Sequence, residues 1–259
     1  MKEEITQLHA GAKAGVEEVI QTISLCKAFG QNRVLNGFDL SLKRGENLVV
    51  LGKSGSGKSV LIKCIVGLLE PDSGEISVFG QSIPQLNQDE LDRIRVKIGF
   101  LFQSSALYDS MTVRENLEFP LRRHATSKNR EEVDALVTEA LENVGLKHAI
   151  DLMPSELSGG MRKRIGLART LILKPEIILY DEPTTGLDPV TGREISHLIV
   201  DIQHKYNTSS IIITHDMGCA RIVADRIMVL ANGICHAQGT FDELKKSGDP
   251  LIKPFFEFT

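Results

Sequence analysis

The sequence contains no tryptophan and only three tyrosines in 259 residues. Proteins that hold single-stranded nucleic acid stack the bases on aromatic side chains, and this chain offers few. It also lacks an excess of positive charge, because 30 Lys and Arg face 34 Asp and Glu and the net charge is -4. The protein as a whole therefore has no net positive charge that would attract the phosphate backbone of a nucleic acid. We expect no nucleic acid among the partners.

Cysteine is scarce and scattered along the chain. The four cysteines are Cys26, Cys64, Cys219 and Cys235. None has CxxC spacing to another, and each stands in or beside an apolar stretch. Such cysteines are more often buried thiols than disulfides or metal ligands, which fits a reducing cytoplasm. We expect free thiols.

Long apolar runs are also missing. No stretch approaches the run of about 18 apolar residues that a membrane-spanning helix needs. Residues 1–18 alternate charged and small side chains, without the apolar segment of a secretory signal. We expect these residues to form a flexible extension, the chain not to span a bilayer, and any membrane role to depend on a partner protein.

What the chain does have is a series of short β-branched runs, several followed by helical patterns. With 42% hydrophobic residues, it can form one large core, alone or with a smaller subdomain. Strands that alternate with helices favour an α/β fold around a parallel sheet. The expected strands are residues 19–26, 38–42, 48–51, 75–79, 98–102, 177–180, 210–214 and 226–230.

The pattern changes in the middle of the chain. Thr112 and Glu115 have the spacing of a capping box that opens a helix. Apolar residues then recur at helical spacing from Val133 to Val144. We predict a helical subdomain over about residues 104–173, inserted into the sheet domain.

A glycine-rich turn follows the apolar strand at 48–51 and leads into a helix. Such a turn lets backbone amides curl around an anion, and the helix start adds unpaired N–H groups and its dipole. We expect it to bind a polyphosphate, with Lys58 bridging the β and γ phosphates and the Ser59 hydroxyl on magnesium. A glycine-rich loop before an ordinary helix is disfavoured, because the whole pattern occurs between a strand and a helix. The residues expected to bind are Gly52, Lys53, Ser54, Gly55, Ser56, Gly57, Lys58, Ser59 and Val60.

Two adjacent acids, Asp181 and Glu182, end the apolar run at 177–180. Ligands of parallel sheets bind at the carboxyl ends of the strands. We therefore expect Asp181 to hold magnesium and Glu182 to face the water that attacks the γ phosphate. The alternative is a solvated acidic turn before Pro183.

Two further polar residues follow expected strands at the same edge. Gln103 stands at the entry to the helical insertion, where its amide could touch magnesium or the attacking water. His215 follows the strand at 210–214, although a histidine at a strand end is often only a surface or capping residue. Asp216 beside it could equally be a helix cap.

A second turn, at Ser158, Gly159 and Gly160, precedes another helical pattern. Its hydroxyl, amides and helix dipole suit an anion, yet the turn has no lysine of the phosphate-binding kind and lies about a hundred residues from Lys58. A plain helix start capped by Ser158 is the alternative. One complete phosphate site and one spare anion turn indicate a protein that works in pairs.

Together these segments resemble the ATP-binding subunits of ATP-binding cassette (ABC) transporters over nearly all of residues 19–240, which would be the ATPase domain. The resemblance implies an α/β fold of the P-loop NTPase class. Its parts would be a mostly parallel central sheet, an N-terminal antiparallel β subdomain and an inserted α-helical subdomain. It also implies ATP and Mg²⁺ as ligands, and two copies that close head to tail on ATP.

The same resemblance implies roles for individual residues. Each nucleotide would be capped by the partner's signature turn, Ser158, Gly159 and Gly160. His215 would be the switch histidine, Asp188 the acid that contacts the partner, and Phe29 the aromatic that stacks on adenine. Phenylalanine stands where tyrosine is commoner, and Met161 replaces the usual glutamine.

Residues 105–113, 158–164 and 247–250 are similar to the Mla/Mce-type ATPases that move phospholipids in bacterial envelopes and chloroplasts. This similarity implies lipid transport and a place on the cytoplasmic face of the inner (plasma) membrane. The implied partners are a second copy, integral membrane permease subunits that dock near residues 103–112, a small regulatory subunit and a lipid-binding protein.

The tail over residues 241–259 carries three phenylalanines near its end. Exposed, they would form an adhesive patch, so they must pack on their own domain or dock on another subunit.

Other functions stay open. The chain could be an ABC ATPase for another substrate, or a cassette ATPase without transport, such as an iron–sulfur assembly or cell-division component. A small-molecule kinase or a GTPase is disfavoured, because the chain has no Asn-Lys-x-Asp guanine motif and a kinase would not need the signature turn.

Overall fold

The computed structural model describes residues 17–124 and 128–257. Two sheets organise these residues, one antiparallel and one mostly parallel. The antiparallel sheet has the order β2-β1-β4-β5, and the larger sheet has the order β10-β9-β3-β8-β7-β6. In sequence order the strands are β1 (Glu18–Phe29), β2 (Asn32–Lys43), β3 (Asn47–Leu51), β4 (Ser73–Val78), β5 (Gln81–Ser82), β6 (Ile98–Leu101), β7 (Ile177–Asp181), β8 (Ser209–Thr214), β9 (Arg226–Ala231) and β10 (Ile234–Gly239).

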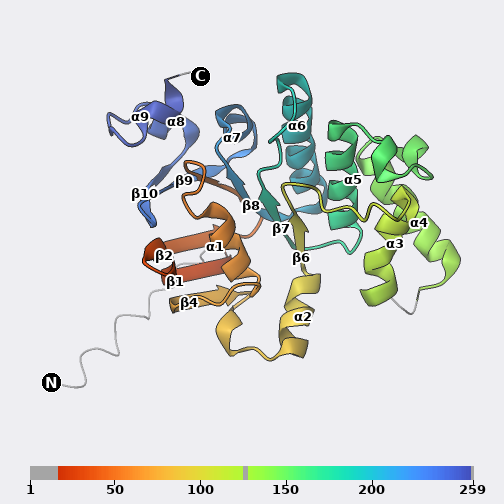
Figure 1. Cartoon of the computed structure of the whole chain (residues 1–259), viewed down its shortest axis with the longest axis horizontal. Coiled ribbons are helices and arrows are strands. Elements are labelled where there is room, and N and C mark those ends of the chain that lie inside the picture. The colour runs from red at the N-terminus through yellow and green to blue at the C-terminus, as the bar shows by residue number, and fades with distance from the viewer. Residues whose placement is uncertain (1–16, 125–127, 258–259) are drawn as a thin grey trace.

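Helices cover the larger sheet and form a group at one side of the molecule (Figure 1). Helices α3, α4 and α5 stand together beyond the β6 edge, away from the antiparallel sheet. The α-helices are α1 (Lys58–Ile65), α2 (Gln88–Val96), α3 (Val113–His124), α4 (Arg130–Asn143), α5 (Gly159–Leu171), α6 (Pro189–Tyr206), α7 (Met217–Val223), α8 (Phe241–Lys245) and α9 (Lys253–Phe256). Short 3₁₀ turns span Ile83–Gln85, Lys147–Ala149 and Pro154–Glu156.

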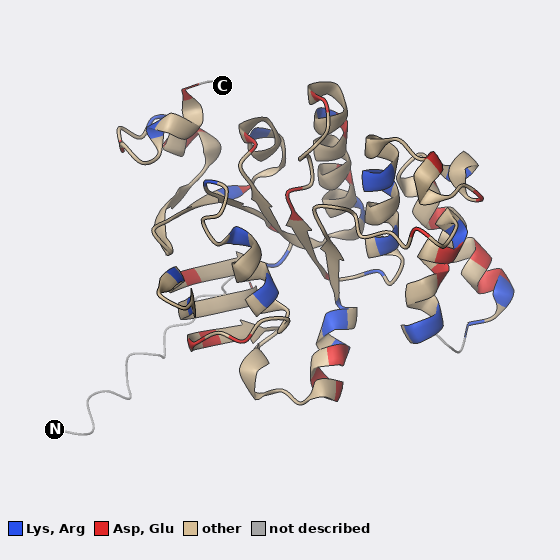
Figure 2. Ribbon diagram, viewed as in Figure 1, with Lys and Arg blue, Asp and Glu red and all other residues tan. Residues whose placement is uncertain are grey.

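The expected α/β fold is confirmed, and its parallel part lies where the sequence predicts. In the larger sheet, strands β9, β3, β8, β7 and β6 pair in parallel, and among the described strands of this sheet only β10 runs antiparallel to its neighbour. Every residue of β3, β7 and β8 is buried. Strands covered on both faces read as continuous apolar runs, which is why their positions could be predicted. Figure 2 shows these central strands almost free of charge, while charged residues gather on α3 and α4.

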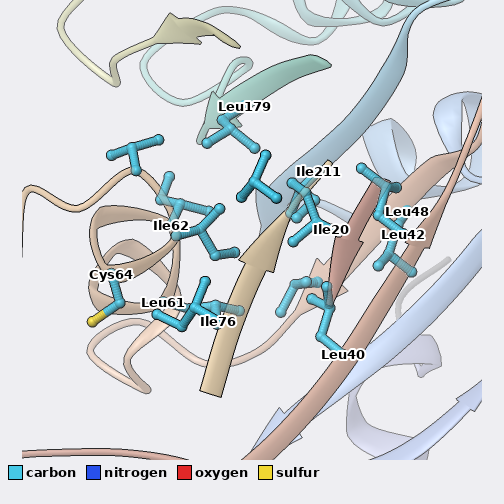
Figure 3. Close-up of a cluster of buried hydrophobic side chains, with 14 of the residues drawn as sticks. Ile20, Leu40, Leu42, Leu48, Leu61, Ile62, Cys64, Ile76, Leu179 and Ile211 are labelled. Atoms are coloured by element: carbon cyan, nitrogen blue, oxygen red, sulfur yellow. The ribbon is translucent and has the colours of Figure 1, made fainter. Parts of the chain in front are cut away.

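Three apolar clusters stabilise the fold. The first lies between the two sheets around α1 (Figure 3). The second lies on the opposite face of the larger sheet, under α6 and α7. The third is formed by α3, α4 and α5, with Leu117, Val137, Leu141 and Ile165 inside it. The helical part therefore has an apolar core of its own.

The helix signals in this part agree with the structure. The main-chain N–H of Thr112 donates to Glu115 Oε2 (2.8 Å), and the main-chain N–H of Glu115 donates back to Thr112 Oγ1 (3.2 Å). This reciprocal box opens α3. The apolar period from Val133 to Val144 belongs to α4, whose inner side is buried.

The sequence prediction missed two strands and set several strand boundaries differently; β2, for example, begins at Asn32, whereas the expected strand begins at residue 38. The edge strand β10 is short and partly polar, and β5 has only two residues. Glu18, expected in the flexible extension, begins β1 and pairs with Lys43. Residues 1–16 of that extension lie outside the described part of the chain. The four cysteines are free thiols, as expected; Cys64 and Cys219 are buried, whereas Cys26 and Cys235 are half-buried.

The tail packs on its own chain as far as it is described. Helix α9 places Phe256 against Phe241 of α8, with ring centroids 5.2 Å apart in an edge-on arrangement. Ile252 and Phe256 are buried in the cluster beneath α7, and Phe255 packs at its margin. The third phenylalanine, Phe258, lies outside the described residues.

Candidate active site

The expected phosphate-binding turn, residues 52–57, connects the buried strand β3 to the start of α1. Gly57 sits just before the helix with a φ of 105°, a conformation that residues with a side chain rarely adopt. A Cβ there would come within 2.5 Å of Val34 Cγ1. Strand β3 lies between β8 and β9 inside the larger sheet. The turn is therefore held by the middle of the sheet and opens at its carboxyl edge, as the sequence predicts.

Lys58, the first residue of α1, is almost fully buried with 5% of its surface exposed. Its Nζ donates to the carbonyl oxygens of Gly52 (2.9 Å) and Lys53 (3.2 Å). The same Nζ lies 3.3 Å from Glu182 Oε1. The ammonium group is thus folded back over the turn and faces the acidic pair.

Asp181, at the end of β7, and Ser59, in α1, are in direct contact. The Ser59 hydroxyl donates to Asp181 Oδ1 at 3.1 Å. Burial raises the pKa of the Asp181 carboxyl, and the hydrogen bond from Ser59 acts in the opposite direction. A hydroxyl and a carboxylate are hard oxygen donors of the kind that Mg²⁺ prefers beside nucleotide phosphates. These residues therefore fit a magnesium ion.

Glu182 has a left-handed backbone with a φ of 50°. For a residue other than glycine this conformation is strained and must be held by its surroundings. The main-chain N–H of Glu182 donates to Ile213 O of β8 (2.9 Å), and the Thr185 hydroxyl donates to Glu182 Oε2 (3.1 Å). His215 Nδ1 lies 2.9 Å from the same carboxylate oxygen. Neighbouring residues therefore fix both the backbone and the carboxylate.

A pocket of about 350 Å³ unites most of the expected nucleotide-binding residues. Phe29, Gln103, Glu182 and His215 reach it from four different parts of the chain. The phosphate-binding turn and its helix contribute Ser54, Gly55, Gly57, Lys58, Ser59 and Val60. Lys53 and Ser56 border an adjoining pocket of about 360 Å³, together with Leu251 and Phe255 of the tail.

The second anion turn lies in a different pocket of about 470 Å³. Ser158, Gly159, Gly160 and Asp188 line it, and none of them borders the pocket that Lys58 lines. Ser158 is also the N-cap of α5, because its Oγ accepts the main-chain N–H of Met161 at 3.2 Å. The structure therefore separates this turn from the lysine-bearing turn of the same chain.

Asp188 and Gly160 are joined through Thr191 of α6. Asp188 caps this helix, accepting the main-chain N–H of Thr191 (3.1 Å) and its hydroxyl (2.6 Å). These hydrogen bonds lower the pKa of Asp188. A Cβ on Gly160 would come within 2.6 Å of Thr191 Cγ2, so only glycine allows α5 and α6 to approach this closely.

Asp216, which the sequence left as an open choice, is a helix cap. Its Oδ1 accepts the main-chain N–H groups of Gly218 (2.8 Å) and Cys219 (3.2 Å) at the start of α7. Its other oxygen accepts the Thr184 hydroxyl at 2.8 Å. The cap fixes the segment that carries His215.

Sequence reasoning missed Lys163 of α5. The residue is 5% exposed, and its Nζ donates to the carbonyl oxygens of Gln103 and of Glu182, the latter at 3.3 Å. Burial lowers the pKa of this ammonium, while the Asp181 and Glu182 carboxylates act in the opposite direction. One signal was available, because Lys163 occupies the same side of the helical period as the buried Leu167. A charged residue on a core-facing position needs a partner.

The chain is similar in sequence and structure to known proteins. A model of the ABC transporter family matches residues 35–185, more than half of the chain. The chain belongs to the ABC transporter family. It is an ATP-binding, ATP-hydrolysing cassette, the ATP-binding subunit of a transporter. None of the helices within residues 17–124 and 128–257 has the length and apolar character required to cross a membrane.

Two relatives and one solved structure extend the match. The chain is 42% identical to the "probable ribonucleotide transport ATP-binding protein mkl" of Mycobacterium leprae, over 91% of this chain and 68% of that protein. It is 37% identical to "protein TRIGALACTOSYLDIACYLGLYCEROL 3, chloroplastic" of Arabidopsis thaliana, over 95% of this chain and 75% of that protein. The ATP-binding cassette MJ0796, solved as a dimer bound to ADP and Pi in a post-hydrolysis state, superposes with a TM-score of 0.78. That match has 32% identity and covers 85% of this chain and 98% of MJ0796.

Proposed function

We propose that Glu182 is the general base of ATP hydrolysis in this cassette. The supporting observation is that its carboxylate lies between Lys58 and His215 at the mouth of the phosphate-binding turn. Glu182 takes a proton from water as the water oxygen bonds to the γ phosphorus. The bond from that phosphorus to the bridging oxygen breaks, and its electrons stay on ADP. Lys58 neutralises the phosphate oxygens, and the Gln103 amide orients the water.

The other pocket residues bind and orient the nucleotide. Phe29, 52% exposed at the pocket rim, offers a flat face on which adenine stacks. The main-chain N–H groups of residues 52–60 surround the phosphates. His215 keeps the Glu182 carboxylate directed at the γ phosphate.

Magnesium belongs with the nucleotide in this site. Ser59 and Asp181 would hold it, with Gln103 as a further oxygen ligand, and the ion supplies charge neutralisation for the β and γ phosphates. The hydrogen bond between Ser59 and Asp181 already brings these two oxygens together.

Two copies of the chain are proposed to share each nucleotide head to tail. Ser158, Gly159 and Gly160 form an anion turn in a pocket separate from Lys58, so a second copy must bring the turn to the phosphates. Asp188 lines that same pocket and would meet the partner near its nucleotide. The dimeric state of MJ0796 supports this arrangement.

The proposed cargo is a phospholipid or a related lipid. This assignment rests on the Arabidopsis relative, whose name is that of a galactolipid, and on the resemblance of residues 105–113, 158–164 and 247–250 to Mla/Mce-type ATPases. Integral permease subunits would dock near residues 103–112 and hold the cassette at the cytoplasmic face of the inner membrane. A small regulatory subunit and a lipid-binding protein would complete the complex. Residues 19–240 would be the working ATPase domain and residues 241–259 a tail.

Another cargo is the competing possibility, since the name of the Mycobacterium leprae relative refers to ribonucleotide transport. The test is purification of the chain in mild detergent from its own cells, with identification of copurifying proteins and lipids. Integral membrane proteins together with enriched phospholipid support the lipid assignment. Membrane proteins without enriched lipid favour another cargo, and absence of membrane proteins contradicts the transport role.

A further inference from the structure

Lys163 is a buried lysine whose ammonium group bonds to main-chain oxygens instead of facing solvent. It donates to the carbonyl oxygens of Gln103 and Glu182, which follow strands β6 and β7 at the carboxyl edge of the larger sheet. These strands are neighbours, with Leu101 paired to Tyr180. One side chain from the helical part of the molecule therefore joins two adjacent strand ends beside the phosphate site.

The carbonyl held by Lys163 belongs to the strained residue of the site. Glu182 has its φ at 50°, and its N–H is held by Ile213 of β8. Lys163 holds the opposite end of the same residue from α5. A left-handed backbone persists only where its surroundings determine it, and these two contacts act on the main chain of Glu182 from different elements.

Beyond Lys163, helix α5 packs closely against the loop that contains Ser105. A Cβ on Gly166 would come within 2.9 Å of Ser105 Cβ, and Arg169 Nη2 donates to Ser105 O at 3.0 Å. The loop that follows Gln103 is thus packed against the same side of α5. A movement of α5 therefore moves the contact to Gln103 and the contact to Glu182 together.

We propose that Lys163 is a positioning residue for hydrolysis, which sets the direction of the Glu182 carboxylate and of the Gln103 amide through their main-chain oxygens. Lys163 is absent from the lining of the nucleotide pocket, so it affects the reaction step and leaves nucleotide binding alone. The inference rests on the proposed role of Glu182 as general base.

The position of Lys163 on α5 gives this role a second consequence. Ser158 caps the start of the helix, and Lys163 follows about one and a half turns later. In the proposed dimer, Ser158 touches the partner's nucleotide while Lys163 holds the chain's own Glu182. Because both residues belong to helix α5, closure of Ser158 onto the partner's nucleotide would also align Glu182 in the chain's own site.

The test compares Lys163→Met, which keeps the length of the side chain but has no donor, with Lys163→Arg, which keeps donors and charge. The matched control is Lys174→Met, because the side chain of Lys174, just beyond the same helix, forms an exposed ion pair with Glu139. For each variant we would measure ATP binding to the monomer, kcat and KM for ATP, and the melting temperature. ATP-driven pairing would be measured with each change placed in a Glu182→Gln background.

The expected result is a split between kcat and KM. Lys163→Met should lower kcat by roughly 10- to 100-fold, the loss typical of a catalytic group displaced by about 1 Å, with KM changed by about twofold or less. ATP binding and ATP-driven pairing should persist, Lys163→Arg should recover most of the lost kcat, and Lys174→Met should match the wild type. If Lys163→Met does not fold, Lys163→Gln, a donor of shorter reach, takes its place with the same expected split.

Three results would overturn the proposal. They are a normal kcat in Lys163→Met, a loss of ATP binding that matches its loss of kcat, and a Lys163→Arg variant that folds but is as slow as Lys163→Met. Normal turnover in Glu182→Gln is a separate outcome, which would reject the proposed role of Glu182 as general base. A slow Glu182→Gln with a normal Lys163→Met rejects only the role of Lys163.

Discussion

The imidazole Nδ1 of His215 lies 2.9 Å from Oε2 of Glu182. The other carboxylate oxygen of Glu182, Oε1, lies 3.3 Å from Lys58 Nζ. The three side chains follow β8, β7 and β3, and β8 is hydrogen-bonded to both of the other strands. The order of strands in the sheet brings Lys58 into one pocket with Glu182 and His215, which lie more than a hundred positions away in the sequence.

Replacement of Glu182 by glutamine should abolish most hydrolysis. The amide is nearly isosteric but cannot accept the proton, so kcat should fall by at least about 100-fold while ATP binding persists. Steady-state phosphate release and equilibrium binding of labelled ATP measure the two effects. Glu131→Gln, an exposed change in the first turn of α4, is the control and should leave both unchanged. Turnover near the wild-type rate in Glu182→Gln would exclude the general-base role.

Replacement of His215 by alanine should slow hydrolysis without preventing nucleotide binding. Loss of the contact at Glu182 Oε2 leaves the carboxylate held by Thr185 and Lys58. We expect kcat to fall by about 100-fold, within the range for a lost acid–base or orienting group, while the binding constant for ATP changes little. His148→Ala, which changes an exposed side chain in a 3₁₀ turn, serves as the comparison. Equal activity of the two variants would argue that His215 is only a surface residue.

Replacement of Ser158 by aspartate separates its two roles. Aspartate caps a helix about as well as serine, so α5 should keep its stability, but its negative charge would repel a phosphate brought by the partner. We expect ATP binding to the monomer to persist, whereas ATP-driven pairing and hydrolysis are lost. Light scattering measures the pairing. Ser158→Asn, a cap without the charge, should be less impaired, and loss of monomer binding in Ser158→Asp would mean that the turn acts on the nucleotide of its own chain.

Replacement of Phe256 by alanine should destabilise the protein. The side chain is 9% exposed and packs edge-on against Phe241, and such truncations cost about 3–5 kcal/mol in a core. Leu251→Ala removes a side chain that is 42% exposed and should change the free energy of unfolding by only about 0.5 kcal/mol or less. Urea unfolding compares the two. Similar stabilities would mean that the tail does not depend on its own domain for packing.

The outline of the fold could be predicted because its signals are local. The buried runs at β3, β7 and β8 are continuous in sequence, and the turn at residues 52–57 carries its own glycines. The antiparallel edge strand β10 was missed, although Asn232 and Gly233 have positive φ in the turn before it, the hairpin signal of an Asn-Gly pair. Its partly polar residues concealed the strand.

The position of the expected site residues at one edge of the sheet could be predicted for the same reason, and Lys163 was missed for the opposite one. Asp181, Glu182 and His215 each stand at the end of an apolar run, so their common edge follows from a parallel sheet. Lys163 lies in a helix between other basic residues. Its proposed positioning role depends on its contacts with the carbonyl oxygens of Gln103 and Glu182, which follow two different strands. Only the folded chain brings those atoms together.

The sequence by itself determined the glycine-rich turn, the two adjacent acids and the alternation of strands with helices, because each depends on residues that are neighbours along the chain. The tertiary structure decided which oxygen of Glu182 meets which cation or imidazole, where Lys163 is held, and that the described tail packs on its own domain. These contacts join residues that lie far apart along the chain, Lys58 and Glu182 most of all. Their geometry arises from the order of strands in the sheet and from packing between layers, neither of which a linear pattern specifies.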